Sequence, residues 1–146
     1  MRSADASDIP LLVTLMTEFY SETATPLDSK QAAVAFAALL GDDRLGHVWL
    51  IQSGDRDVGY VVITFSYSME FGGPNAFLDD LFIQPPFRGA GLGTAALHEV
   101  RAFCLQRRVR ALQLETGKDN AAAQALYRRA GFKVTDRQLL TLVLAN

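Results

Sequence analysis

Residues 77–97 read FLDDLFIQPPFRGAGLGTAAL, and this stretch decides the fold. It joins a run of strand-forming residues to a glycine-rich turn and the start of a helical pattern. Gly89, Gly91 and Gly93 let backbone N–H groups crowd together, and a helix that begins beside them adds unpaired donors and a positive dipole end. Arg88 adds a fixed positive charge with a planar set of donors. The turn is therefore predicted to bind phosphate, and a pyrophosphate in particular.

Two common phosphate-binding motifs fit this turn poorly. A P-loop requires Gly-Lys-Ser/Thr after a four-residue spacer, and no lysine lies between Lys30 and Lys118. Residues 91–96, GLGTAA, match a dinucleotide-binding fingerprint, with Glu115 at the end of the next predicted strand. However, Pro85-Pro86 make a wide exit from the strand, and no second nucleotide-binding half follows. A small NAD-binding oxidoreductase is therefore the weaker alternative.

A second motif, NAAAQALYRRAGF, occupies residues 120–132. Its Asn120, Ala123 and Tyr127 share one face of a helix. Together with Arg88-x-x-Gly91-x-Gly93, this motif resembles the acyl-CoA-binding signatures of the GNAT superfamily of CoA-dependent N-acyltransferases. The resemblance implies an α/β fold of the α+β type over residues 1–146. Such a fold has a mixed, twisted sheet of about six or seven strands, with about four helices on its two faces.

Size and composition agree with one domain. The chain has 146 residues, 49% of them hydrophobic, a net charge of −2 and a single cysteine, Cys104. These values predict one core, no internal disulfide and no general attraction for nucleic acid. No histidine pair suggests a metal site, and no apolar run reaches the roughly 20 residues of a membrane span. A cytoplasmic protein without nucleic-acid or membrane partners is predicted.

The remaining elements are predicted from hydrophobic periodicity and from end signals. A loop is expected at residues 67–75, before the strand that carries LDDLFI. The predicted helices cover residues 8–20, capped by Ser7 or Asp8, and 28–40, 91–107 and 120–130. The predicted strands cover residues 1–4, 47–52, 58–66, 76–84, 110–116, 132–135 and 138–145.

The strand at residues 76–84 carries two adjacent carboxylates, Asp79 and Asp80. Alternation along a strand places these two side chains on opposite faces. A carboxylate in an otherwise apolar strand is costly to bury unless it is paired or useful, so at least one is expected to line a wet cleft. A capping or ion-pairing role stays open for each of them.

The GNAT resemblance implies how acetyl-CoA would be held. Its pyrophosphate would lie on the N–H groups of residues 89–94, and its pantetheine arm would pair with the preceding strand as an added strand does. The expected cofactor-binding residues are Leu81, Phe82, Ile83, Arg88, Gly89, Ala90, Gly91, Leu92, Gly93, Thr94 and Asn120.

Acetyl transfer to an amine requires an uncharged nucleophile, a polarised carbonyl and a protonated leaving thiolate. Because an alkyl ammonium has a pKa of about 10, a base helps at neutral pH. Asp79 or Asp80, acting through water, is the candidate base, and a backbone N–H near Leu81 can polarise the carbonyl. Tyr127 matches the superfamily's usual general acid, and its alternative role is an aromatic packed between helix and sheet. Direct attack needs no covalent intermediate.

The acceptor is predicted as a primary amine of a small cationic molecule. LDDLFI resembles the LEDFFV type of segment in the diamine and polyamine acetyltransferase branch, with Asp79 in place of a glutamate, and the shorter side chain favours a water relay. A polyamine, an aminoglycoside and a lysine side chain all remain open. Acceptor contacts are expected from Glu18, Tyr20 and Glu22 at the end of the first helix, where a solvated helix end is the alternative. The acidic residues Glu18, Glu22 and Glu70, together with the two aspartates, would suit a cationic acceptor.

Two further expectations concern activity and assembly. A non-catalytic acyl-CoA sensor would keep the phosphate-binding turn without needing Tyr127 and the aspartates, so it is the alternative to an acetyltransferase. The resemblance also implies a homodimer, with the final strand or the apolar second helix as the contact.

Overall fold

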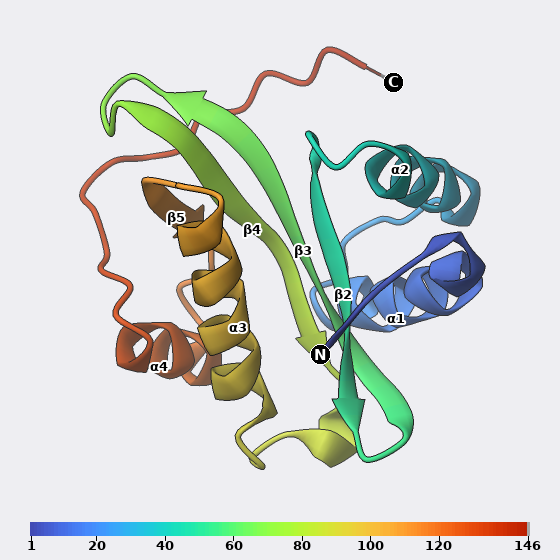
Figure 1. Ribbon diagram of the computed structural model, residues 1–146. Helices are drawn as coiled ribbons and strands as arrows, with labels where there is room; N and C mark the ends of the chain where they lie inside the picture. Colours follow the sequence, from blue (N-terminus) through green and yellow to red (C-terminus); the bar gives the residue numbers. More distant parts are fainter. Residues whose placement is uncertain (146) are drawn as a thin grey trace.

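The computed structural model describes residues 1–145. Its centre is a five-stranded mixed sheet in the order β1-β2-β3-β4-β5, in which β1 to β4 are antiparallel and β5 runs parallel to β4. Figure 1 shows α1 and α2 on one face of this sheet, and α3 and α4 on the other. The strands are β1 (Arg2–Ser3), β2 (Gly46–Ser53), β3 (Arg56–Ser68), β4 (Gly73–Ile83) and β5 (Ala111–Leu114). The helices are α1 (Ile9–Glu22), α2 (Ser29–Gly41), α3 (Leu92–Gln106) and α4 (Ala121–Arg129), with short 3-10 turns at Ala6–Asp8 and Pro85–Phe87.

Alternation along the strands divides the buried residues into two cores. In β2, Val48 and Leu50 pack beneath α1 and α2, whereas Trp49 and Ile51 pack beneath α3. This division is what a sheet covered on both faces requires, because successive side chains point to opposite sides. The predicted α/β fold, with a mixed sheet between two pairs of helices, is confirmed.

Local side chains fix the helix ends. Asp28 caps α2 by accepting the N–H groups of Lys30 and Gln31, as a cap residue does. Asp8 occupies the N-cap position of α1, as predicted, but its side chain makes no capping hydrogen bond there, and Asp5 caps the preceding 3-10 turn. Asp8 instead forms an ion pair with Arg2, whose guanidinium holds the pKa of this carboxyl below its usual value. The Asp8 carboxylate therefore ties the first helical turn to β1.

The β3–β4 hairpin is longer than the sequence predicts. A loop was expected over residues 67–75, but β3 continues to Ser68 and β4 begins at Gly73. The chain reverses within residues 69–72, where Gly72 adopts a φ of +71° that most side chains disfavour. The glycine makes the tight turn, so the flanking residues stay in the ladder.

The two strands predicted at residues 132–135 and 138–145 are wrong, and the described part of the sheet has five strands instead of six or seven. Figure 1 shows the chain after α4 running past the β3–β4 hairpin as an extended tail. Arg137 fixes this tail to Glu70 through an ion pair of 2.6 Å. A strand needs hydrogen bonds to a neighbouring backbone to form a ladder, and no ladder within residues 1–145 includes the tail. Its apolar side chains are therefore 68–91% exposed: Val134, Leu139, Leu140, Leu142, Val143 and Leu144.

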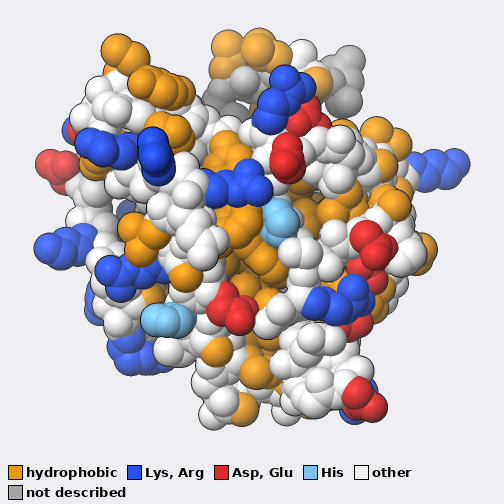
Figure 2. Space-filling model, in the orientation of Figure 1, with side chains coloured by type: hydrophobic (Ala, Val, Ile, Leu, Met, Phe, Trp, Pro, Cys, Tyr) orange, Lys and Arg blue, Asp and Glu red, His pale blue; other side chains and the backbone are white. Residues whose placement is uncertain are grey.

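The surface is unevenly charged. Figure 2 shows Lys and Arg side chains gathered on the side of the molecule that carries α3 and α4. No helix in residues 1–145 is long and apolar enough to cross a membrane.

Candidate active site

A β-bulge in β4 brings the two aspartates together. Val62 of β3 pairs with Asp80, whereas the next residue, Ile63, pairs with Leu78, so Asp79 is an extra residue in β4. Because the extra residue shifts the alternation, Asp79 and Asp80 line the same pocket. The prediction that the two carboxylates point to opposite faces is therefore wrong.

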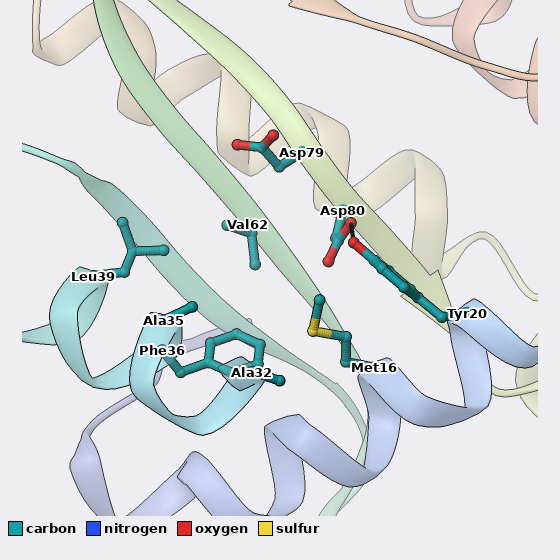
Figure 3. Close-up of a pocket in the computed structure, with 9 residues that line it drawn as sticks. All are labelled: Met16, Tyr20, Ala32, Ala35, Phe36, Leu39, Val62, Asp79 and Asp80. Atoms are coloured by element: carbon teal, nitrogen blue, oxygen red, sulfur yellow. Dashed lines mark hydrogen bonds between the residues drawn. The ribbon is translucent and has the colours of Figure 1, made fainter. Parts of the chain in front are cut away.

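This pocket lies between α1, α2 and the β3–β4 pair and has a volume of about 220 Å³. Figure 3 shows Asp79 and Asp80 projecting from β4, with Ala35 and Leu39 on the α2 side. The pocket combines a wall of carboxylates with a wall of hydrocarbon. The complete lining is Met16, Tyr20, Ala32, Ala35, Phe36, Leu39, Val62, Asp79 and Asp80.

Asp80 is buried, with 7% of its surface exposed, and two tyrosines hold it. The Tyr20 hydroxyl donates to Oδ1 at 3.2 Å (Figure 3). The Tyr60 hydroxyl donates to Oδ2 at 2.8 Å. Burial raises the pKa of Asp80, the two hydroxyl bonds oppose this effect, and the charge of Asp79 adds to it. Burial and the Asp80 charge raise the pKa of Tyr20 to about 12, so its hydroxyl keeps its proton. Asp80 is thus a carboxylate whose pKa is moved toward neutrality inside a pocket.

Asp79 differs from its neighbour because it is exposed. Its Oδ2 accepts a hydrogen bond from Thr64 Oγ1 at 2.6 Å. Neither aspartate forms an ion pair with an arginine anywhere in residues 1–145. The alternative of an ion-pairing role for these carboxylates is therefore not what the structure shows.

The edge of β4 that faces β5 is unpaired beyond Leu78, where the parallel ladder stops. The Gln84 N–H donates to Val58 O at 2.9 Å, and hydrogen-bonded pairs alternate along an antiparallel ladder. The backbone groups of Leu81 and Ile83 therefore point away from β3 and into the gap, as a strand-like ligand would require. Phe82 does not share this orientation, because its backbone faces β3.

The side chain of Phe82 also lies away from the gap. It is 2% exposed, in the core beneath α1, where it stacks on Phe19 with ring centroids 5.4 Å apart. Among the three strand residues predicted to bind the cofactor, the backbone geometry thus favours Leu81 and Ile83.

The glycine-rich turn has the backbone conformation that phosphate binding requires. Gly89 and Gly91 adopt φ values of +80° and +83°, and a Cβ at Gly93 would lie 3.1 Å from Leu126 Cδ2. The first helical bond of α3 is donated by the Ala95 N–H. The N–H groups of residues 89–94 consequently have no acceptor within the described chain. Six unpaired donors beside a helix N-terminus form a fitting cradle for a pyrophosphate.

Arg88 lies beside this turn with its donors engaged by protein groups. Its Nε donates to Ile83 O at 2.7 Å, and its Nη2 donates to Glu22 Oε1 at 2.7 Å. The guanidinium also covers the ring of Phe82 at 5.5 Å from the centroid. The cation predicted to hold phosphate is therefore paired with the end of α1.

Tyr127 is half-buried on α4 and packs edge to face against Phe132, with centroids 5.7 Å apart. Burial raises the pKa of Tyr127, and the negative charge of Asp80 raises it further, so the phenol stays protonated at neutral pH. Both predicted roles, aromatic packing and a proton donor, are compatible with this position. Asn120 caps α4, since its Oδ1 accepts the Ala123 N–H at 3.1 Å.

The residues predicted to bind the acceptor separate into different positions. Tyr20 lines the pocket and contacts Asp80, but Glu18 accepts both its bonds from Gln84 Nε2 at 3.2 Å. Glu22 holds Arg88, and Glu70 lies at the far hairpin turn with Arg137.

Several residues of the site were missed by sequence reasoning, and Tyr60, which donates to Asp80 from beneath the pocket lining, is the most informative of them. Its only sequence signal is a hydroxyl in the apolar run VGYVVI, which takes on meaning only once β3 is paired with β4. The same holds for the apolar wall of α2, which the sequence predicts only as one of two alternative dimer contacts.

The open strand edge beside a glycine-rich turn, with a carboxylate pocket on one face of the sheet and a tyrosine on the other, is the arrangement expected of a CoA-dependent acyltransferase. The model of the acetyltransferase (GNAT) family matches residues 11–132, and the chain belongs to this family. Acetyltransferases of this family use acetyl-CoA. The protein is therefore an acyltransferase enzyme and not a dinucleotide-dependent oxidoreductase.

Characterised relatives act on amines. Over 141 residues the chain is 26% identical to the aminoglycoside N(6')-acetyltransferase type 1 of Stenotrophomonas maltophilia, covering 94% of this chain and 88% of the relative. It is 34% identical to the thialysine N-epsilon-acetyltransferase of Bos taurus over 74 residues, 51% of this chain and 43% of the relative. The acyl acceptor differs between these two relatives, so the family does not fix the acceptor here.

Solved structures reproduce the fold. An integron cassette protein from the mobile metagenome of Cole Harbour Salt Marsh superposes with a TM-score of 0.90 at 46% identity, covering 99% of this chain and 90% of that one. A predicted acetyltransferase from Clostridium acetobutylicum, solved with acetyl-CoA, superposes with a TM-score of 0.82 at 21% identity, covering 97% and 94%.

Proposed function

We propose that this enzyme transfers an acetyl group from acetyl-CoA to the primary amine of a small cationic molecule. One observation supports the proposal: a single segment, residues 79–83, borders both the carboxylate pocket and the open strand edge beside β5. Its aspartate side chains line a pocket on the α1–α2 face, and its backbone at Leu81 and Ile83 faces the gap beside β5. Donor and acceptor can therefore meet at this segment.

The donor would be held by the chain's own backbone. The N–H groups of residues 89–94 suit the pyrophosphate, and Arg88 would leave Glu22 to join them. The Leu81 backbone and the Ile83 N–H supply strand-like partners for the pantetheine amides, whereas Ile83 O already accepts the Arg88 Nε–H. Asn120 retains its side-chain NH₂ as a donor, because its capping bond uses only Oδ1. These contacts would bring the thioester to the opening between Asp80 and Tyr127.

The chemistry follows from the protonation states of these two groups. Asp80, with its raised pKa, accepts a proton from the bound ammonium through water, which frees the nitrogen lone pair. The nitrogen forms a bond to the acetyl carbon while the carbon–sulfur bond breaks, and an N–H of the gap, such as that of Leu81, polarises the carbonyl. Tyr127 gives its proton to the departing sulfur and regains one from solvent, while the acylated nitrogen releases its second proton to water, which leaves a neutral amide and the free thiol of CoA. Asp79 adds negative charge for the ammonium.

The acceptor assignment rests on charge and on relatives. Two carboxylates face the pocket and no lysine or arginine lines it, so an ammonium is the matching ligand. Relatives named for aminoglycoside and thialysine acetylation support an amine acceptor.

We also propose a homodimer in which the tail of one copy pairs with β5 of the other. β5 has a partner on one edge only, and the tail carries exposed apolar residues with strand-like alternation. Deleting the tail after Phe132 should convert the dimer to a monomer in light scattering, whereas a monomeric full-length protein would contradict the contact. Location in the cytoplasm stays a prediction from the sequence.

The function is tested in two steps. Calorimetric titration with acetyl-CoA should show micromolar binding that weakens in Arg88→Ala, while NADH should not bind. A thiol-release assay with a panel of amines should then show turnover that falls by roughly 10²–10⁴-fold in Asp80→Asn. Acetyl-CoA binding without thiol release from any amine would leave a sensor and overturn the enzyme proposal.

A further inference from the structure

The proposed acceptor pocket has a charged end and an entirely apolar remainder, and this asymmetry selects among amines. Resting on the proposed function, we propose that the acceptor carries a single ammonium group on an unbranched or flat apolar body. Such a monoamine would be preferred over diamines, polyamines and aminoglycosides.

The apolar wall is a continuous face of α2. Ala32, Ala35, Phe36 and Leu39 follow the i, i+3, i+4, i+7 spacing of one helical face, and all four line the pocket. Met16 of α1 and Val62 of β3 extend this surface (Figure 3). Apart from the Tyr20 hydroxyl, which is committed to Asp80, these walls offer no polar side chain. The body of the acceptor would therefore meet hydrocarbon.

A second ammonium group would find no partner inside the pocket. The two carboxylates of α1 do not supply one, because neither Glu18 nor Glu22 lines the pocket and Glu18 is already engaged by Gln84. An ammonium placed against Ala32 or Phe36, which are both buried, would lose its hydration without gaining an opposite charge. Diamines of the pocket's length should consequently bind less well than monoamines of equal length.

The size of the pocket limits the body of the acceptor. A cavity of about 150 Å³ accommodates benzene, so the 220 Å³ here suits a ligand of roughly nine heavy atoms. An aminoglycoside with several sugar rings is far larger and carries an ammonium on more than one ring. Its hydroxyl groups would also lie against the α2 face without hydrogen-bond partners.

The decisive experiment compares two matched series in the thiol-release assay, linear monoamines and α,ω-diamines with the same number of carbons. For monoamines, kcat/KM should rise roughly fourfold per methylene until the chain reaches about eight carbons, as burial of each CH₂ predicts. Diamines should remain at least about tenfold below the monoamine of the same length, because the distal charge is desolvated. Diamines that match or exceed the monoamines, or a flat dependence on chain length, would overturn the inference while leaving acetyl transfer intact.

Two variants of Leu39 test whether the apolar wall of α2 sets the selectivity between monoamines and diamines. Leu39→Asp places a carboxylate on the apolar wall and should raise the diamine-to-monoamine ratio of kcat/KM by about tenfold, whereas the nearly isosteric, uncharged Leu39→Asn should not. Thermal melting shows that both variants are folded, and calorimetric binding of hexylamine to the CoA-loaded protein gives a readout independent of turnover. If no amine of either series is acetylated although acetyl-CoA binds, the proposed function fails, and the selectivity proposal fails with it.

Discussion

Replacing Glu22 by glutamine should tighten the binding of acetyl-CoA. Glu22 Oε1 accepts the Arg88 Nη2 hydrogen bond at 2.7 Å, so the guanidinium must leave this partner before it can hold a pyrophosphate. The Arg88 and Glu22 side chains are 46% and 38% exposed, which places them among solvent-screened pairs worth about 0.2–1 kcal/mol. Removing the competing carboxylate should therefore lower the Kd for acetyl-CoA by about 1.4- to 5-fold. Repulsion between Glu22 and the pyrophosphate adds in the same direction and weakens with salt.

Calorimetry on four proteins isolates this effect: wild type, Glu22→Gln, Arg88→Ala and the double variant. The gain from Glu22→Gln should disappear when Arg88 is already alanine, because the pair no longer exists. Glu18→Gln is the matched control, since Glu18 lies one turn earlier on α1 and contacts Gln84 instead of Arg88. Its acetyl-CoA affinity should equal that of wild type.

Two results would refute this reasoning. Weaker binding of acetyl-CoA by Glu22→Gln would mean that the carboxylate positions Arg88 for the cofactor instead of competing with it. An undiminished gain in the Arg88→Ala background would mean that the ion pair is not the cause. If Glu22→Gln raised only the KM for the amine and left acetyl-CoA binding unchanged, Glu22 would have the acceptor-binding role predicted from the sequence.

Three further predictions address the chemistry and the turn. Tyr127→Phe should lower kcat by about 100-fold or more and leave the Kd for acetyl-CoA within about twofold, and an unchanged kcat would restrict the tyrosine to packing. Because Asp80 acts as a base only when ionised and its pKa is raised, kcat/KM should fall as pH drops through a value above the usual aspartate range. Asp79→Asn removes a like charge beside Asp80 and should therefore shift this fall in kcat/KM to lower pH. An unshifted pH profile would mean that Asp80 is not the base. Gly89→Ala, at a φ of +80°, should cost about 1–2 kcal/mol of unfolding free energy and weaken acetyl-CoA binding, while Gly117→Ala, with open space and no left-handed φ, should do neither.

The conformation of the glycine-rich turn was predictable from sequence because its determinants are local. Glycines with left-handed φ values, a helix start and a preceding strand all lie within residues 77–97, so no distant contact is needed to recognise them. The second motif was equally readable, since Asn120 caps α4 and Tyr127 lies on the same helix, seven residues along. Together these two motifs carried the family assignment.

The pocket could not be predicted in the same way, because its walls belong to three distant segments. Tyr60 reaches Asp80 only through the β3–β4 register, and the α2 face becomes a pocket wall only through its packing. Strand propensity gave a wrong prediction of two strands in residues 132–145 for a related reason. Alternation reports which side chains prefer a sheet, but a ladder also needs a backbone alongside, and this chain does not supply one to its own tail.

The bulge at Asp79 connects these observations. Apolar residues of the α3 core occur at Ala76 and Leu78 and then at Leu81 and Ile83, so the even spacing of a regular strand is interrupted once, at the two aspartates. Pairing with β5 stops at Leu78, the residue before the interruption, and a bulge both disrupts a ladder and increases the local twist. The same extra residue turns Asp79 toward the pocket that Asp80 already lines. The inserted residue thus lies where the opening beside β5 begins and where the two carboxylates come together. For this reason, the acceptor and the donor are expected to meet at this point of β4.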